Sequence, residues 1–202
     1  MVIRKATKSD VKNLALAHER IFDDFFMASL GTSFLKVYYR TAVDYEATSC
    51  FIAYDESGNC LGFVFGRKTA KGYLKRLLKR GFWRFALCGV KLLFTRPKAV
   101  IRLAKNLEKR GETEGVKDQQ DYAEIGLIGV APEYKSQGIG HKLYHAFEED
   151  VKQKGAKQIS LTTDYYDNDN TLTAYKAWGF TPLYDFISYP NRRMYRLIKT
   201  IG

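Results

Sequence analysis

Apolar residues recur at strand or helix spacing along most of the chain, and this pattern predicts the elements of the first half. Residues 2–6 predict a short strand, and residues 9–22 and 32–45 predict two helices joined by an irregular, aromatic-rich link. Residues 50–54 and 60–66 predict a β-hairpin, because two apolar runs flank a polar turn that contains glycine. The first half is therefore expected to run strand, helix, helix, hairpin.

The second half is predicted in the order strand, helix, strand, helix and two final strands. Residues 123–130 form a strand that Pro132 ends, residues 138–155 form an amphipathic helix, and residues 158–163 form the next strand. A strand–helix–strand unit places its two strands in parallel with a right-handed crossover, so the class is mixed α/β. The remaining elements are a helix over 168–178 and strands over 180–189 and 193–198.

The net charge of +11 is concentrated in residues 68–118, between the third and fourth strands. This segment holds 15 Lys/Arg against 4 Asp/Glu, whereas the rest of the chain holds 18 of each. Leucines at helical spacing among the cations predict a helical insertion, extended by a stretch from Pro97 to about Gly111, rather than a second domain. Three interpretations stay open: a solvated cationic helix pair, a face that lies on an anionic membrane, or a binding region for an anionic substrate.

The composition agrees with one well-packed domain over residues 1–202, with 46% hydrophobic and 14% aromatic residues. No apolar run reaches the roughly 18 residues of a spanning helix, and the N-terminus lacks a signal-peptide core. We therefore expect a cytoplasmic protein, located at the inner membrane face if the insertion binds lipid. Three cysteines and three histidines lack metal-ligand spacing, so no metal site is expected. No nucleic-acid partner is expected, and the chain is predicted to be a monomer or a homodimer.

The loop VAPEYKSQGIGH, which joins the strand at 123–130 to the next helix, is the clearest candidate site. Unpaired N–H groups and the helix dipole attract an anion to a helix N-terminus. Gly138 and Gly140 let a phosphate approach the backbone, and Lys135 and His141 add positive charge. The Walker spacing and the third glycine of a dinucleotide motif are both absent. The expected guest is a pyrophosphate.

These residues resemble the acetyl-CoA-binding motif of the GNAT acetyltransferase superfamily, whose pattern is Q/R-x-x-G-x-G/A. Lys135 stands at the first position and departs from the pattern, although it keeps a positive charge. A second motif agrees, because Asn168, Tyr175 and Gly179-Phe180 are spaced like the family's N-x(6)-Y-x-x-x-G-F. The resemblance, clear over residues 122–200, implies a GNAT fold with a central mixed twisted sheet flanked by helices. It also implies acetyl-CoA as the co-substrate.

The resemblance also implies roles for individual residues. Glu124 is expected to be the general base, directly or through a water, and a position beside an apolar cleft predicts a raised pKa. Tyr175 resembles the general acid that donates to the departing thiolate. The fourth strand is expected to separate from its parallel neighbour near Gly126 and Gly129, so that its backbone can pair with the pantetheine arm. The expected coenzyme-binding residues are Ile128, Gly129, Val130, Lys135, Ser136, Gln137, Gly138, Ile139, Gly140, His141 and Asn168.

Each of these residues also has a purely structural interpretation. Glu124 could be an ion-pairing strand residue, Tyr175 a core tyrosine and Asn168 a helix N-cap. Weaker candidates for the base are Asp121, Asp164 and Asp167.

The predicted function is direct transfer of an acetyl group from acetyl-CoA to an amine, without a cysteine nucleophile. The favoured acceptor is a small amine such as an amino sugar or a nucleotide-linked amino sugar, because a diffuse similarity to GNAT proteins of bacterial surface-polysaccharide pathways extends into the insertion. The alternatives are a protein acetyltransferase acting on N-termini or lysines, and a non-catalytic acyl-CoA-binding or membrane-associating module. The acceptor is expected between the first helices and the last hairpin, near His18, Arg20, Phe22, Phe25, Phe26, Tyr165, Tyr166, Tyr189, Arg192 and Arg193.

Overall fold

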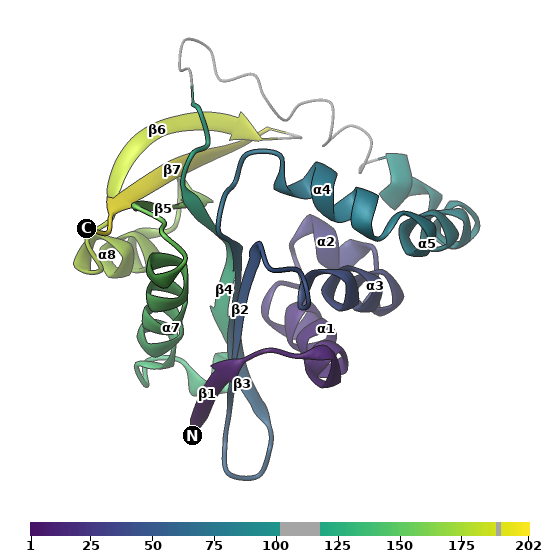
Figure 1. The fold of residues 1–202 in the computed structure, drawn as a ribbon, viewed down its shortest axis with the longest axis horizontal. Coiled ribbons are helices and arrows are strands. Elements are labelled where there is room, and N and C mark those ends of the chain that lie inside the picture. Colours follow the sequence, from purple (N-terminus) through teal and green to yellow (C-terminus); the bar gives the residue numbers. More distant parts are fainter. Residues whose placement is uncertain (102–117, 189–190) are drawn as a thin grey trace.

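The computed structural model describes residues 1–101, 118–188 and 191–202, and its elements follow the predicted order (Figure 1). The mixed α/β class is confirmed. The strands are β1 (Val2–Lys5), β2 (Thr48–Tyr54), β3 (Cys60–Arg67), β4 (Ala123–Val130), β5 (Gln158–Asp164), β6 (Thr181–Ser188) and β7 (Arg192–Thr200). The helices are α1 (Val11–Ile21), α2 (Phe26–Ser29), α3 (Thr32–Ala42), α4 (Tyr73–Arg80), α5 (Phe82–Thr95), α7 (Ile139–Gln153) and α8 (Asp169–Ala177), with short 3-10 turns at Lys8–Asp10 and Pro132–Tyr134.

Within the described ranges the strands form one mixed sheet in the order β1-β2-β3-β4-β5-β7-β6. All neighbours are antiparallel except β4 and β5, which are parallel and are joined through α7, as predicted. This parallel pair is short, because its register runs only from Ala123 opposite Ile159 to Ile125 opposite Leu161. The predicted separation of β4 from β5 is therefore confirmed.

On its other side, β4 stays paired with β3 as far as Val130. The register between them shifts at Gly126, since Phe65 pairs with Leu127 and the next residue of β3 pairs with Ile125. A bulge of this kind bends the strand and increases its local twist. The bulge lies at the point where β4 leaves β5, so the distortion of β4 and the separation of the two strands occur together.

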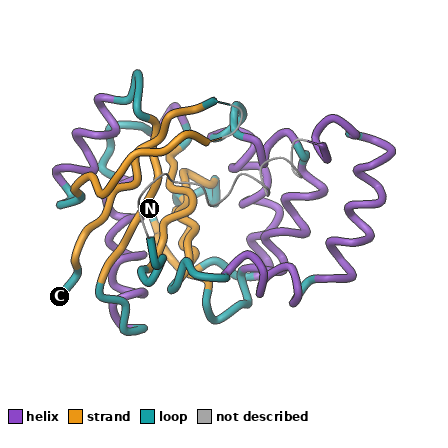
Figure 2. Tube along the Cα trace, turned by 90° about the horizontal axis from the view of Figure 1, so that it is seen from above, coloured by secondary structure: helices purple, strands orange, loops and turns teal. Residues whose placement is uncertain are grey.

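Helices cover both faces of the sheet, α1 to α5 on one side and α7 and α8 on the other (Figures 1 and 2). Alternate residues of a strand point to opposite faces. Accordingly, Phe63 and Phe65 enter the core under α1 and α3, whereas Val64 enters the core under α7. The place where β4 separates from β5 therefore lies between these two layers of helices.

The insertion between β3 and β4 begins with α4 and α5, which confirms its predicted helical character over 73–95. Cys88 and Leu92 of α5 pack on Leu30, and Arg96 donates a 2.8 Å hydrogen bond to the carbonyl oxygen of Ser29. The stretch predicted to begin at Pro97 is helical over residues 97–101, and its remainder lies outside the described residues. Among the helices that the structure describes, none has the length and apolarity needed to cross a bilayer.

Candidate active site

The glycine-containing loop predicted to hold a pyrophosphate does begin a helix. Gly138 is the N-cap residue of α7 and has a φ of +73°, a left-handed conformation that glycine adopts without strain. The first helical hydrogen bond runs from the N–H of Lys142 to the carbonyl oxygen of Gly138. The N–H groups of residues 139–141 precede it, as expected for the first turn of a helix. A Cβ at Gly138 would have no other atom within 4 Å, so this side of the loop is open.

Most residues predicted to bind the coenzyme lie together around this helix start. Lys135, Gln137 and His141 are exposed, and Gly140 lies against the end of β4, where a Cβ would stand 3.8 Å from the Val130 side chain. The His141 ring contacts Trp178 at a centroid distance of 5.8 Å, so α8 borders the same region. The arrangement combines open N–H groups, two exposed cationic or ionisable side chains and a free strand edge, which suits an elongated anionic ligand.

The openness of Gly138 leads to the first testable prediction. Gly138→Ala should raise the KM for acetyl-CoA at least fivefold, because the new methyl group would project where a phosphate is expected to approach. The left-handed backbone also disfavours alanine, by roughly 1–2 kcal/mol. The measurement is initial-rate kinetics with varied acetyl-CoA, together with thermal unfolding.

Gly155, just beyond the other end of α7, provides the matched control. Its φ is +80°, and a Cβ there would also meet no atom within 4 Å. Gly155→Ala should therefore carry a similar backbone strain and leave the KM for acetyl-CoA unchanged. If both substitutions raised the KM for acetyl-CoA equally, the rise would come from backbone strain, and Gly138 would be excluded from the coenzyme site.

Tyr175, the predicted general acid, lies in α8 and is buried in the core under α7. Its ring packs edge-on against Trp178 and Phe180. Burial raises the pKa of Tyr175 to about 12, so the hydroxyl stays protonated at neutral pH. Among the residues that the structure describes, none forms a hydrogen bond with this hydroxyl. The Tyr175 hydroxyl is therefore a protonated group that is available to donate a hydrogen bond.

Asn168 precedes α8, but its side chain does not cap the helix. The Asn168 amide instead donates to the Thr163 hydroxyl at 2.6 Å and to the Asp164 carbonyl oxygen at 3.0 Å. These bonds fix the end of β5 to the start of the helix that carries Tyr175. The side chain of Asn168 therefore does not act as the predicted N-cap of α8, and it binds the end of β5 instead.

Glu124, the predicted general base, is buried on β4 and engaged on both carboxylate oxygens. Arg196 of β7 donates to Oε1 at 2.7 Å, and Arg67 of β3 donates to Oε2. Burial alone would raise the pKa of Glu124, but the two guanidinium groups outweigh it and lower the pKa below its usual value. The prediction of a raised pKa is therefore wrong, because the carboxylate lies between two arginines rather than against an apolar wall.

Sequence patterns did not reveal these two arginines. Arg67 and Glu124 are directly paired across β3 and β4, and Arg196 reaches Glu124 across β5, which lies between β7 and β4. The contacts depend on the register of several strands, and no local motif encodes that register. The Nε atoms of both arginines are buried without a hydrogen-bond partner among the described residues.

Glu124 and Tyr175 lie on opposite faces of the sheet. Ala123 and Ile125, the neighbours of Glu124, point into the core that contains Tyr175. Glu124 itself therefore points to the face of α1 to α5. Of the weaker base candidates, Asp164 forms an ion pair with Arg192, whereas Asp121 and Asp167 are exposed.

On the predicted acceptor side, the loop after α1 meets the end of β5 and the start of β7. The Arg192 guanidinium lies 5.0 Å from the Phe25 ring centroid and pairs with Asp164, and the Arg193 guanidinium lies 4.0 Å from the Tyr165 ring centroid. Tyr189 lies outside the described residues. The structure thus brings into contact several of the aromatic and cationic residues that were predicted to lie near the acceptor.

His18 does not belong to this group. It is fully buried in the core under α1, where its Nδ1 forms a 2.7 Å hydrogen bond with the Tyr39 hydroxyl. Burial lowers the pKa of His18 to about 4, so the ring is neutral at physiological pH. Phe22 is also a core residue. The expectation that His18 borders the acceptor is therefore wrong, because α1 turns it towards the sheet, whereas Phe22 packs on Phe25 at a centroid distance of 5.3 Å.

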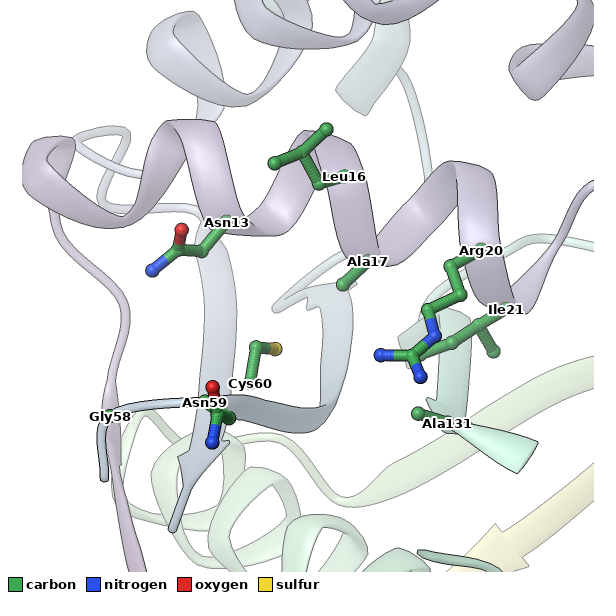
Figure 3. Close-up of a pocket in the computed structure, with 9 residues that line it drawn as sticks. All are labelled: Asn13, Leu16, Ala17, Arg20, Ile21, Gly58, Asn59, Cys60 and Ala131. Atoms are coloured by element: carbon green, nitrogen blue, oxygen red, sulfur yellow. The ribbon is translucent and has the colours of Figure 1, made fainter. Parts of the chain in front are cut away.

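A cavity of about 240 Å³ lies between α1 and the β2–β3 turn, and Figure 3 shows the side chains that line it. None of the predicted catalytic residues lines it, although Arg20 on its rim pairs with Glu133 of the coenzyme loop. Small-molecule sites usually measure about 300–1,000 Å³, so we do not place the acceptor here. The residues that line the cavity are Asn13, Leu16, Ala17, Arg20, Ile21, Gly58, Asn59, Cys60 and Ala131.

Comparisons with known proteins agree with this geometry. The model of the acetyltransferase (GNAT) family matches residues 16–180. N-alpha-acetyltransferase 30 of Schizosaccharomyces pombe (strain 972 / ATCC 24843) is 31% identical over 80 residues, which cover 33% of this chain and 53% of that protein. The chain therefore spans about half the length of the curated relative that it matches.

Two solved structures share the fold. One is an acetyltransferase that is 18% identical, with a TM-score of 0.65 and coverage of 100% of both chains. The other is a chimera of the spermidine N-acetyltransferase SpeG from Vibrio cholerae and hSSAT, which is 14% identical with a TM-score of 0.59 and covers 99% of this chain and 96% of that one. Since the family model matches most of the sequence and the sheet, parallel pair and loop agree with it, this chain belongs to the GNAT acetyltransferase family.

Proposed function

We propose that this chain transfers the acetyl group of acetyl-CoA to an amine. GNAT acetyltransferases use acetyl-CoA, and the chain belongs to that family. The observation that best supports the proposal is the separation of β4 from β5 immediately before the open N-terminus of α7. The free edge of β4 over residues 126–130 would pair with the pantetheine amides, and the loop would bind the pyrophosphate.

In the proposed reaction the amine nitrogen attacks the thioester carbonyl carbon. A C–N bond forms, the C–S bond breaks, and the thiolate leaves as coenzyme A. The Tyr175 hydroxyl, protonated and without a competing hydrogen bond among the described residues, donates to the departing sulfur. Backbone N–H groups of β4 are suitable donors to the oxyanion of the tetrahedral intermediate.

The proton that the acceptor ammonium must lose is assigned to Glu124. Both of its oxygens bind arginines, so the proton would pass through a water rather than directly to the carboxylate. The lowered pKa of Glu124 makes it a weak base, so the carboxylate would orient the water that takes up the proton and passes it to solvent, rather than hold the proton itself.

For the acceptor, we propose a small amine such as an amino sugar, free or linked to a nucleotide. The contact between Phe25 and Arg192 brings the segment after α1 against the start of β7. Guanidinium groups at this position could also bind the phosphates of a nucleotide-linked acceptor.

A protein N-terminus is the second candidate, and one observation favours it. The curated relative is an N-alpha-acetyltransferase, and its identity with this chain is 31% over the aligned residues.

The acceptor class can be tested by measuring thiol release from acetyl-CoA over a panel of amines. The panel contains hexosamines, nucleotide-linked amino sugars, spermidine and peptides with free N-termini. We expect kcat/KM for an amino sugar to exceed that for every peptide at least tenfold, with mass spectrometry locating the acetyl group on nitrogen. A peptide as the best acceptor would establish the second candidate. Saturable acetyl-CoA binding without turnover on any amine would contradict the enzyme assignment.

A further inference from the structure

Helix α5 carries an exposed apolar stripe along its whole length. Trp83, Leu87, Val90 and Phe94 follow one another at intervals of four, three and four residues, which places them on one side of a helix. Their side chains are 76%, 73%, 55% and 85% exposed. The opposite side of α5 is buried, through Cys88 and Leu92, so the stripe is not part of the core.

The charge around the stripe has a single sign. Residues 68–101 contain no Asp or Glu. Their cations are Lys68, Lys71, Lys75, Arg76, Lys79, Arg80, Arg84, Lys91, Arg96 and Lys98. Lys75 and Lys79 of α4 are exposed and take part in no ion pair among the described residues, and Arg84 and Lys91 of α5 are exposed beside the stripe. A protruding apolar side with flanking cations is the pattern of an interfacial amphipathic helix.

The position of α5 makes this surface accessible. Figures 1 and 2 show α5 at the end of the molecule farthest from α7 and α8, beyond α2 and α3. A flat partner could therefore touch the stripe without approaching the N-terminus of α7, where the coenzyme is expected.

From these observations we propose that α4 and α5 form a docking surface for an anionic lipid bilayer. The stripe enters the boundary between headgroups and acyl chains, and the cations contact lipid phosphates. Charge complementarity favours this occupant over a second copy of the chain. A two-fold symmetric contact through the same surface would place the cationic rims of both copies against each other.

The test uses the full chain with sedimentable vesicles of phosphatidylcholine that contain 30% or 0% phosphatidylglycerol. We expect binding to the anionic vesicles, at least tenfold weaker binding to the neutral ones, and weakening by salt. Trp83 and Trp178 are the two tryptophans. In a Trp178→Phe background, the emission of Trp83 should shift to the blue and be quenched by brominated acyl chains.

Two variants with matched controls separate the contributions. Trp83→Ser with Phe94→Ser should reduce binding to anionic vesicles at least tenfold, whereas Leu183→Ser with Ile187→Ser on β6, also exposed, should not. Lys75→Gln with Lys79→Gln should likewise weaken binding about tenfold or more, since each lysine near an anionic surface contributes roughly fivefold. Lys12→Gln with Lys157→Gln is the control for the change in net charge.

Several outcomes would overturn the proposal. They are the absence of vesicle binding, binding that does not depend on lipid charge, and equal binding by the α5 and β6 variants. Concentration-dependent dimerisation that only the α5 substitutions abolish, without vesicle binding, would assign the stripe to self-association instead. Circular dichroism of each variant confirms that the fold is retained. Because no acetyl transfer is measured, the result does not depend on the proposed reaction.

Discussion

Replacing Tyr175 by phenylalanine is expected to lower kcat at least tenfold while leaving acetyl-CoA affinity almost unchanged. The ring packs against Trp178 and Phe180, and phenylalanine keeps these contacts. The hydroxyl has no hydrogen-bond partner among the described residues, so its removal leaves no other polar group unpaired. What the variant loses is the proposed donor to the departing thiolate. The measurements are steady-state kinetics and direct titration with acetyl-CoA.

Tyr39 offers a matched control, because it is a fully buried tyrosine on the opposite face of the sheet. Its hydroxyl forms the hydrogen bond with His18, so Tyr39→Phe should cost about 1–2 kcal/mol of folding free energy and leave kcat intact. An unchanged kcat in Tyr175→Phe would exclude Tyr175 as the general acid. Equal losses of kcat in both variants would point to a general effect on the core.

The second large effect is expected from Glu124→Gln. The substitution leaves Arg67 and Arg196 without their shared anion, and both guanidinium groups are largely buried. Removing one partner of a buried ion pair costs about 3–5 kcal/mol, so the free energy of unfolding should fall by roughly that amount. Urea denaturation measures it. Glu148→Gln, which removes the buried α7 carboxylate that pairs with Lys199 of β7, is the control and should cost less, because it leaves a single cation unpaired.

The same variant tests whether Glu124 is the base. Its pKa is lower in the folded protein than in the unfolded chain, so its stabilising effect is present above the unfolded pKa of about 4.3 and is lost as pH falls through the folded pKa. We therefore expect no limb near neutral pH in kcat/KM that belongs to Glu124. A limb between pH 6 and 7 in the native enzyme, absent from a folded Glu124→Gln variant, would contradict this and identify a base of raised pKa.

The features of the fold that depend on local sequence pattern could be predicted from the sequence. The order of elements, the parallel pair and the helix start at Gly138 follow from periodicity, turn residues and one short motif. The surroundings of Glu124 did not follow, because Arg67 and Arg196 come from strands that become its neighbours only in the finished sheet. The burial of His18 was missed for a related reason. The spacing of a helix indicates which residues share a face, but a polar residue on the apolar face is identified only when its hydrogen-bond partner, here Tyr39, is known.

The insertion is a second case in which the sequence pattern predicted an element but not its packing. Its charge and helical spacing were visible in the sequence, but the side of α5 that packs on Leu30 and the side that stays exposed were not. Only the placement of α5 beyond α2 and α3 separates them. One apolar side of α5 is therefore exposed, although composition alone would have assigned its residues to the core.

The separation of β4 from β5 also bears on aggregation. Residues 126–130 of β4 present an unpaired edge inside the sheet, and an exposed edge can recruit a strand from another chain. Two features of this edge oppose such recruitment. It is short and bulged at Gly126, and β5 diverges beside it, so an incoming strand would find no flat, extended template. The distortion that is proposed to make room for a pantetheine arm therefore also opposes the addition of a strand from another copy of the chain at that position.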